Sequence, residues 1–167
     1  MIQGFLCRVC GKYHDELPLA YGAKAPYDWD VIKHEDEESC SLTDEICFIN
    51  NKFFYIKGCI EIPIHDYEQS FSWDVWVSVK KENMKIQFDY WDTKNRENLV
   101  KPMFGWLSVK LPLYPSTYGL KTMIHTRKCG IRPYIELEAT DHPLSIEQRT
   151  GISIEKVKET ASLLLHR

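Results

Sequence analysis

In the stretch Phe71-Ser72-Trp73-Asp74-Val75-Trp76-Val77-Ser78-Val79, every second residue is apolar. Strict alternation of this kind predicts a β-strand with one buried face. Trp73 falls on that face, so we expect it to lie in the core. Trp76 falls between the apolar positions and should face outward or toward a second layer. The stretch therefore predicts that a sheet dominates the fold.

Two hairpins are expected around this strand. Residues 46–49 and 53–64 are rich in β-branched and aromatic side chains, and Asn50-Asn51 lies between them as a turn. Residues 120–127 and 131–138 form the second pair. The turn joining this pair falls at Cys129-Gly130, where glycine supplies the positive φ of a tight turn.

The second turn also sets a register. It places Ile124 opposite Ile135 on one face, with His125 opposite Tyr134 on the other. Arg127 would then lie opposite Arg132, and the two guanidinium groups would either splay into water beside the turn or come close enough to share one anion.

Helices are expected to flank the strands. A short exposed helix is expected over 28–38, and one over 82–92 should pack Met84, Phe88 and Trp91 on the sheet. Thr93 to Lys101 is expected to be a polar loop. A C-terminal helix should be capped by Ser153, with an inward stripe at Ile154, Val157, Ala161 and Leu164.

Composition limits the function classes. A chain of 167 residues is about the size of one domain. Its net charge of −3 and its pI of about 6.1 do not give the basic surface that nucleic-acid binding needs. The sequence shows neither a signal-peptide pattern nor an apolar run long enough to cross a membrane. We therefore expect a cytosolic protein, whose six cysteines are thiols or metal ligands rather than disulfides.

The segment Cys7-Arg8-Val9-Cys10-Gly11 has the spacing with which two thiolates bind one tetrahedral ion. His14 follows four residues later, and Cys40 or Cys47 offers a ligand from distant chain. The alternatives are an unmetallated thiol pair and a redox motif. The redox alternative is weaker, because residues 11–18 do not resemble the helix that follows a thioredoxin-type motif.

Together these patterns predict an α+β fold with a mainly antiparallel sheet, flanking helices and an N-terminal zinc-knuckle-like turn. We expect residues 1–167 to form a single domain, in which the Cys-x-x-Cys segment 1–25 packs on the main sheet.

The sequence contains no Gly-rich phosphate loop, no Gly-x-Ser-x-Gly and no His-Glu-x-x-His, so it gives no enzyme signature. The candidates for catalysis lie on the polar face of the second hairpin: His125, Arg127, Arg132 and Glu136.

Several strings follow one another in order along nearly the whole chain: Phe5-x-Cys7-x-x-Cys10-Gly11-x-x-His14, Asp44-x-x-Cys47, Phe53-Phe54, Glu61-Ile62-Pro63, Val75-Trp76-Val77-Ser78, Phe104-Gly105-Trp106-Leu107-Ser108 and Arg132-Pro133-x-Ile135-Glu136-Leu137-Glu138-x-Thr140-Asp141-His142-Pro143-Leu144. Together they resemble a bacterial family of uncharacterised proteins, domain of unknown function 2199. The resemblance implies a bacterial cytosolic protein of one domain and brings no activity with it.

The family pattern includes counterparts of Cys7, Cys10 and Cys47, and this favours Cys47 over Cys40. The expected site is therefore a structural zinc ion bound by Cys7, Cys10, Cys47 and His14, which would pin the N-terminal segment onto the sheet at 46–49.

Two functions remain open at this point. The first is a binding protein with a protein partner, favoured by rings in excess of what one core needs: Trp76, Trp91, Trp106, Tyr114 and Tyr118. The second is an enzyme acting on a small anionic substrate through the His125/Arg127/Arg132/Glu136 face. The lack of enzyme motifs favours the binding protein. The sequence does not predict an oligomeric state.

Overall fold

A computed structural model describes residues 2–167 of the chain. The strands are β1 (Phe5–Leu6), β2 (Tyr13–His14), β3 (Ala20–Gly22), β4 (Ser41–Leu42), β5 (Ile46–Ile49), β6 (Phe53–Pro63), β7 (Ser70–Val79), β8 (Met103–Leu107), β9 (Lys121–His125) and β10 (Tyr134–Leu137). The helices are α1 (Asp28–Val31), η1 (Glu37–Ser39), α2 (Lys81–Asp89), α3 (Arg96–Leu99), α4 (Pro143–Thr150) and α5 (Ile154–Leu164).

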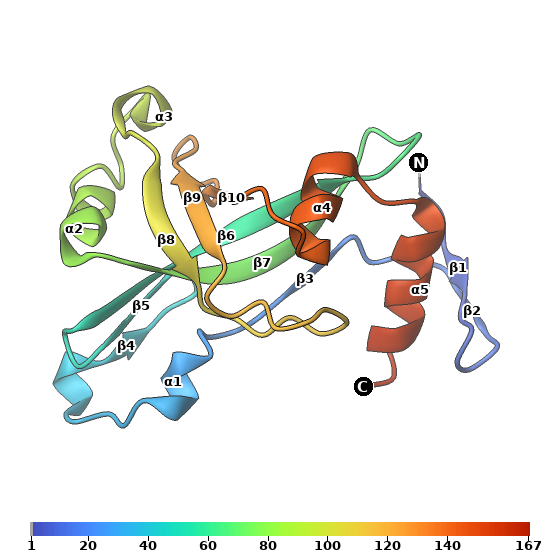
Figure 1. The fold of residues 1–167 in the computed structure, drawn as a ribbon, viewed down its shortest axis with the longest axis horizontal. Helices are drawn as coiled ribbons and strands as arrows, with labels where there is room; N and C mark the ends of the chain where they lie inside the picture. Colours follow the sequence, from blue (N-terminus) through green and yellow to red (C-terminus); the bar gives the residue numbers. More distant parts are fainter. Residues whose placement is uncertain (1) are drawn as a thin grey trace.

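Five consecutive strands, β6 to β10, close into a barrel (Figure 1). Neighbouring strands pair antiparallel, and the ring closes where β10 pairs with β6 in parallel through Tyr134 and Cys59. The expected α+β class and the mainly antiparallel pairing are confirmed. The sequence did not show that the sheet closes on itself, because the closing contact joins residues far apart in the chain.

Gly58 explains how β10 approaches β6 so closely. A Cβ atom at this position would lie 2.6 Å from the Ile135 side chain and 2.8 Å from the Pro133 carbonyl oxygen. Only glycine leaves room for that approach. The barrel closure is therefore encoded at one residue of β6.

The barrel extends into a wider sheet along its two longest strands. β5 and β4 continue from β6, and β3 pairs in parallel with β7. Asn50 and Asn51 both have positive φ in the turn between β5 and β6, as a tight hairpin requires, so the first expected hairpin is confirmed.

The buried core confirms which face of β7 points inward. Trp73 is 2% exposed, and the other apolar positions of β7 are buried with it. Trp76 is buried as well, on the opposite face. Its indole N–H donates to the Ala23 carbonyl oxygen, and Lys57 Nζ lies 5.6 Å from the ring centroid. A second layer therefore covers Trp76, which was one of the two expected placements.

The second hairpin has the predicted register, with Ile124 opposite Ile135 and His125 opposite Tyr134. Its turn lies at Cys129-Gly130, where the Ile131 N–H donates to the Lys128 carbonyl oxygen. The ladder ends at His125, however, so Arg127 and Arg132 are not a cross-strand pair.

The helix predictions were less accurate. The expected helix at 28–38 is two short pieces, α1 and η1, and the expected loop at 93–101 contains α3. α2 buries Met84 and Gln87, while Phe88 and Trp91 are exposed. The expected apolar stripe was therefore wrong beyond Met84, because Gln87 turns inward to donate to Thr126 Oγ1.

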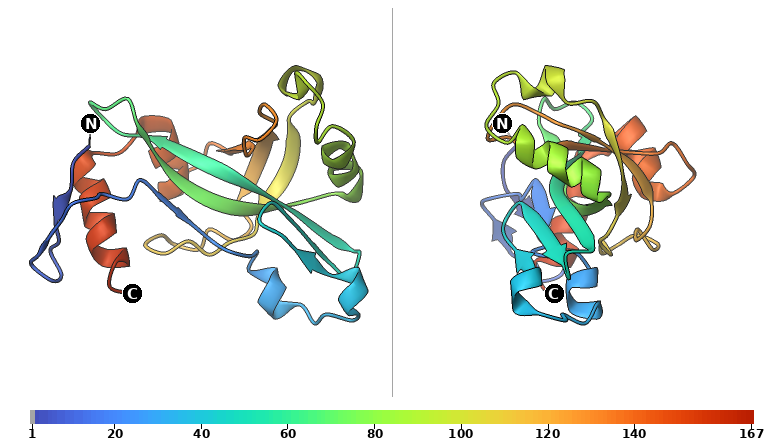
Figure 2. Two further views of the ribbon diagram at one scale, coloured as in Figure 1. Left: turned by 180° about the vertical axis from the view of Figure 1, so that it is seen from behind. Right: turned by 90° about the vertical axis from the view of Figure 1, so that its left-hand side faces the viewer.

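The β1–β2 hairpin and α5, which lie near the two ends of the sequence, are side by side at the end of the molecule away from α2 and α3 (Figure 2). Within residues 2–25, only β3 joins the main sheet; the β1–β2 hairpin is a separate two-stranded sheet. Among residues 2–167, none of the helices has the length and apolar character needed to span a bilayer.

Candidate metal centre

The Cys-x-x-Cys turn connects β1 to β2. The Cys7 N–H donates to the Lys12 carbonyl oxygen, and the Gly11 N–H donates to the Cys7 carbonyl oxygen. Gly11 has a φ of 70°, which glycine adopts without strain. These hydrogen bonds close the turn that holds the two cysteines. On either side of it, β1 and β2 pair Phe5 with His14.

α5 positions the fourth residue of the site, His166. Ser153 caps it by accepting from the Lys156 N–H, and Val157 and Ala161 are buried on its inner face, as predicted. The hairpin is fastened to this helix by the Arg8 N–H, which donates to Ser162 Oγ at 3.1 Å. His166 therefore follows the last turn of α5 directly beside the cysteine turn.

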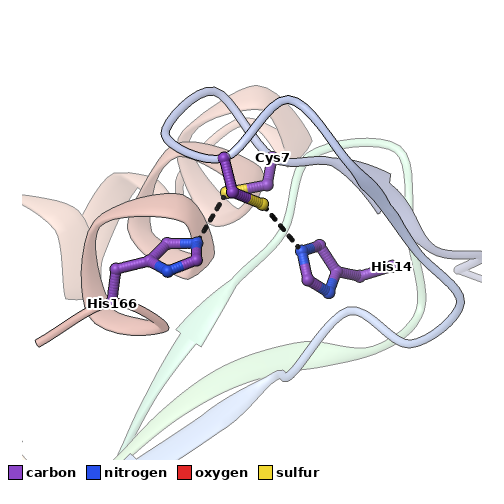
Figure 3. Close-up of side chains that lie close together, drawn as sticks. Cys7, His14 and His166 are labelled. Carbon is purple, nitrogen blue, oxygen red and sulfur yellow. Dashed lines mark hydrogen bonds between the residues drawn. The ribbon is translucent and has the colours of Figure 1, made fainter.

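Four ligand atoms converge here, from Cys7, Cys10, His14 and His166, and all lie within 4.8 Å of one another. Cys7 Sγ is 3.2 Å from His166 Nε2, and Cys10 Sγ is 3.5 Å from His14 Nε2. Figure 3 shows His14 and His166 on opposite sides of Cys7. Tetrahedral zinc with ordinary Zn–S and Zn–N lengths would hold sulfur and nitrogen about 3.5 Å apart. The cluster therefore has the spacing of a four-ligand metal site.

The surroundings of Cys7 favour the thiolate that a metal needs. Burial acts to raise the pKa of the Cys7 thiol, but backbone N–H groups of Cys10 and Val9, together with the His166 ring, outweigh it. They lower the pKa to about 6. The turn is thus arranged to stabilise negative charge on sulfur before any cation binds.

Cys47 does not belong to this cluster, and its expected role as a ligand is corrected. It is buried in β5, paired with Tyr55 on one side and Leu42 on the other. Burial, with Cys40 and Asp28 nearby, raises the pKa of its thiol to about 12. Cys47 is therefore a core side chain, and the site joins the N-terminal hairpin to α5 instead of to 46–49.

His166 is the member of the cluster that sequence reasoning missed. The chain has six histidines, and no local motif distinguishes this one. Its place in the site follows only from the topology that brings the two chain ends together. Cys7, Cys10 and His14 were found because one short hairpin contains all three.

The proposed catalytic face is not assembled as one site. His125 Nε2 lies 3.2 Å from Glu136 Oε1 on an exposed surface. Arg127 Nη1 instead donates to Glu61 at 2.6 Å, and Arg132 makes a two-pronged contact with Glu45. The two guanidinium groups therefore neutralise protein carboxylates, which removes the reason to expect a shared anion between them.

A cavity of about 640 Å³ lies beside these two arginines, lined also by Cys59, Trp91 and Arg96. Neither His125 nor Glu136 lines it. Burial and the hydrogen bond to Asp74 raise the pKa of Cys59 to about 11, so this thiol is a poor nucleophile. Cys59 therefore gives the cavity no activated thiol.

Comparison of the chain with curated proteins and with solved structures finds no match. A family model does match it. Cys7, Cys10 and His14 fall within the matched range, and His166 falls outside it. Residues 6–152 match the model of an uncharacterized protein conserved in bacteria, DUF2199, and the chain belongs to that family.

Proposed function

We propose that the chain is a binding protein whose two ends are joined by one structural zinc ion, bound by Cys7, Cys10, His14 and His166. The observation that carries the proposal is the convergence of these four ligand atoms from two distant segments. Two thiolates and two imidazoles form a donor set that suits tetrahedral zinc.

The role proposed for the metal is structural because the protein supplies all four ligands. A catalytic zinc site keeps one position for water or substrate, and this set leaves none. The β1–β2 hairpin has no other sheet neighbour within residues 2–167, and a two-stranded hairpin is marginally stable alone. The ion would supply the stability that the hairpin lacks.

Binding is favoured over catalysis by the state of the arginines. Arg127 forms an ion pair with Glu61, and Arg132 forms one with Glu45. His125 contacts Glu136 on an open surface. An enzyme that acts on a small anion through this face would need those ion pairs to open. A bacterial cytosolic location remains part of the proposal, since thiolate ligands need reducing conditions.

Elemental analysis of protein purified without a metal-binding tag tests the proposal. We expect close to one zinc per chain. Cys7→Ser and His166→Ala should each lower the zinc content strongly, because each removes a ligand. Cys47→Ser is the matched control and should retain the metal, since Cys47 lies in the sheet. Less than about 0.2 zinc per chain in the unaltered protein would overturn the metal site.

A further inference from the structure

A second concave surface lies at the opposite end of the barrel from the metal cluster, where β6, β7 and β8 meet the start of α2. It is a groove of about 650 Å³, and its lining includes six aromatic or charged residues: Lys52, Phe53, Phe54, Lys80, Phe104 and Trp106. We refer to it as the aromatic groove. Its volume falls within the range of ligand sites, which is about 300–1,000 Å³.

Exposed rings form the walls of the aromatic groove. Phe53 is 43% exposed, Phe104 38% and Trp106 46%. Phe104 and Trp106 meet edge to face with ring centroids 4.9 Å apart, which fixes their orientation. Both project outward from β8, whose inward residues are buried. Exposed rings held in one place are typical of binding surfaces.

The charged side chains that line the groove are all cationic. Lys52 and Lys80 line it, and no Asp or Glu does. Lys52 makes one exposed contact with Glu35 at 3.5 Å, an ion pair of the weak class. Within residues 2–167, Lys80 has no carboxylate at ion-pair distance. The groove therefore favours an anionic ligand.

The start of α2 adds to this preference. Lys80 is the N-cap residue and makes no side-chain cap, and Lys81 and Glu82 follow it in the first turn. A helix N-terminus carries partial positive charge and is stabilised by anions, so Glu82 follows the usual rule and the two lysines oppose it. Local rules are broken most often at functional sites, where another gain compensates. A partner carboxylate at this end would cap the helix and neutralise Lys80.

We propose that the aromatic groove binds a peptide segment of a protein partner in which an Asp or Glu stands beside an aromatic or aliphatic residue. The apolar side chain would pack against Phe104 and Trp106, and the carboxylate would reach Lys80 and the start of α2. This inference rests on the proposed function as a binding protein and names the class of its partner. Single-stranded nucleic acid is disfavoured, because the chain carries a net charge of −3 and the groove offers two lysines.

An array of immobilised peptides tests the proposal on the full chain. One set places Asp or Glu beside each type of apolar residue, and a matched set carries Lys in place of the acid. We expect binding to members of the acidic set and at least tenfold weaker binding to their lysine counterparts. Trp106→Ala should weaken binding at least tenfold, while Trp91→Ala, an exposed tryptophan outside the groove, should leave it unchanged.

Lys80→Glu is the decisive variant. It places a negative charge at the positive end of α2, so the variant should fold as well as the unaltered protein. We expect it to lose binding to the acidic peptides at least tenfold without loss of melting temperature. The proposal is overturned if acidic and lysine peptides bind alike, if Lys80→Glu leaves binding unchanged, or if a uridine oligonucleotide competes better than the peptides.

Zinc content measured on the same samples separates this inference from the metal site. Protein that carries zinc but ignores the acidic peptides contradicts the groove assignment alone. Protein that binds the peptides without zinc contradicts the structural metal alone.

Discussion

Trp73→Ala should destabilise the fold by about 3–5 kcal/mol, the usual effect of deleting a large buried ring. Trp73 packs against Phe71 and Tyr21 at ring centroid distances of 5.2 and 5.7 Å. Its indole N–H donates to Tyr114 Oη, which itself donates to Glu147. Truncation would leave a cavity and remove a donor from this buried chain of hydrogen bonds. Denaturant titration measures the change through the free energy of unfolding.

Trp106→Ala is the matched control, because Trp106 is exposed on the outside of β8. Its loss should change the free energy of unfolding by less than about 1 kcal/mol. If Trp73→Ala lowered the free energy of unfolding by less than about 1 kcal/mol, the assignment of the Trp73 face of β7 to the core would be wrong.

Chelation of zinc should release the β1–β2 hairpin while the barrel stays folded. Without the ion, the hairpin keeps the Arg8 N–H bond to Ser162, an exposed ion pair between Arg8 and Glu155 at 3.9 Å, and the packing of Phe5. The barrel has its own core, and a chain of this length does not depend on a metal for it. Amide exchange at residues 5–14 should therefore be at least tenfold faster with chelator than without it, because a two-stranded hairpin is only marginally stable alone.

Cys7→Ser supplies the control for this experiment, since a variant without the site should exchange rapidly at 5–14 whether or not chelator is present. Unchanged protection of the hairpin after complete removal of zinc would show that packing alone holds it. Loss of protection in β6 and β7 as well would show that the metal supports the whole fold.

The strand regions could be predicted from sequence because their patterns are local. Alternation in β7, the Asn50-Asn51 turn and the Cys129-Gly130 turn each encode structure within about ten residues. β8 was not predicted as a strand, although Met103 and Leu107 are buried at alternating positions, because Gly105 interrupts its apolar pattern.

In the candidate site too, residues close together in the sequence were predicted and the distant one was not. Cys7, Cys10 and His14 lie in one short hairpin, so their spacing revealed them. His166 lies at the other end of the chain, and Cys47 was favoured instead because family resemblance ranks residues without placing them in space. Barrel closure was missed for the same reason, since β10 meets β6 through residues distant in sequence.

X-ray absorption at the zinc edge tests the central claim most directly. For zinc-loaded protein without a tag, the account predicts two sulfur ligands at about 2.3 Å and two imidazole nitrogens at about 2.0–2.1 Å. In the zinc that His166→Ala still binds, one nitrogen should be missing and both sulfurs should remain. Three sulfur ligands would restore a third cysteine to the site, and a shell of oxygen with no sulfur would contradict metal binding by Cys7 and Cys10.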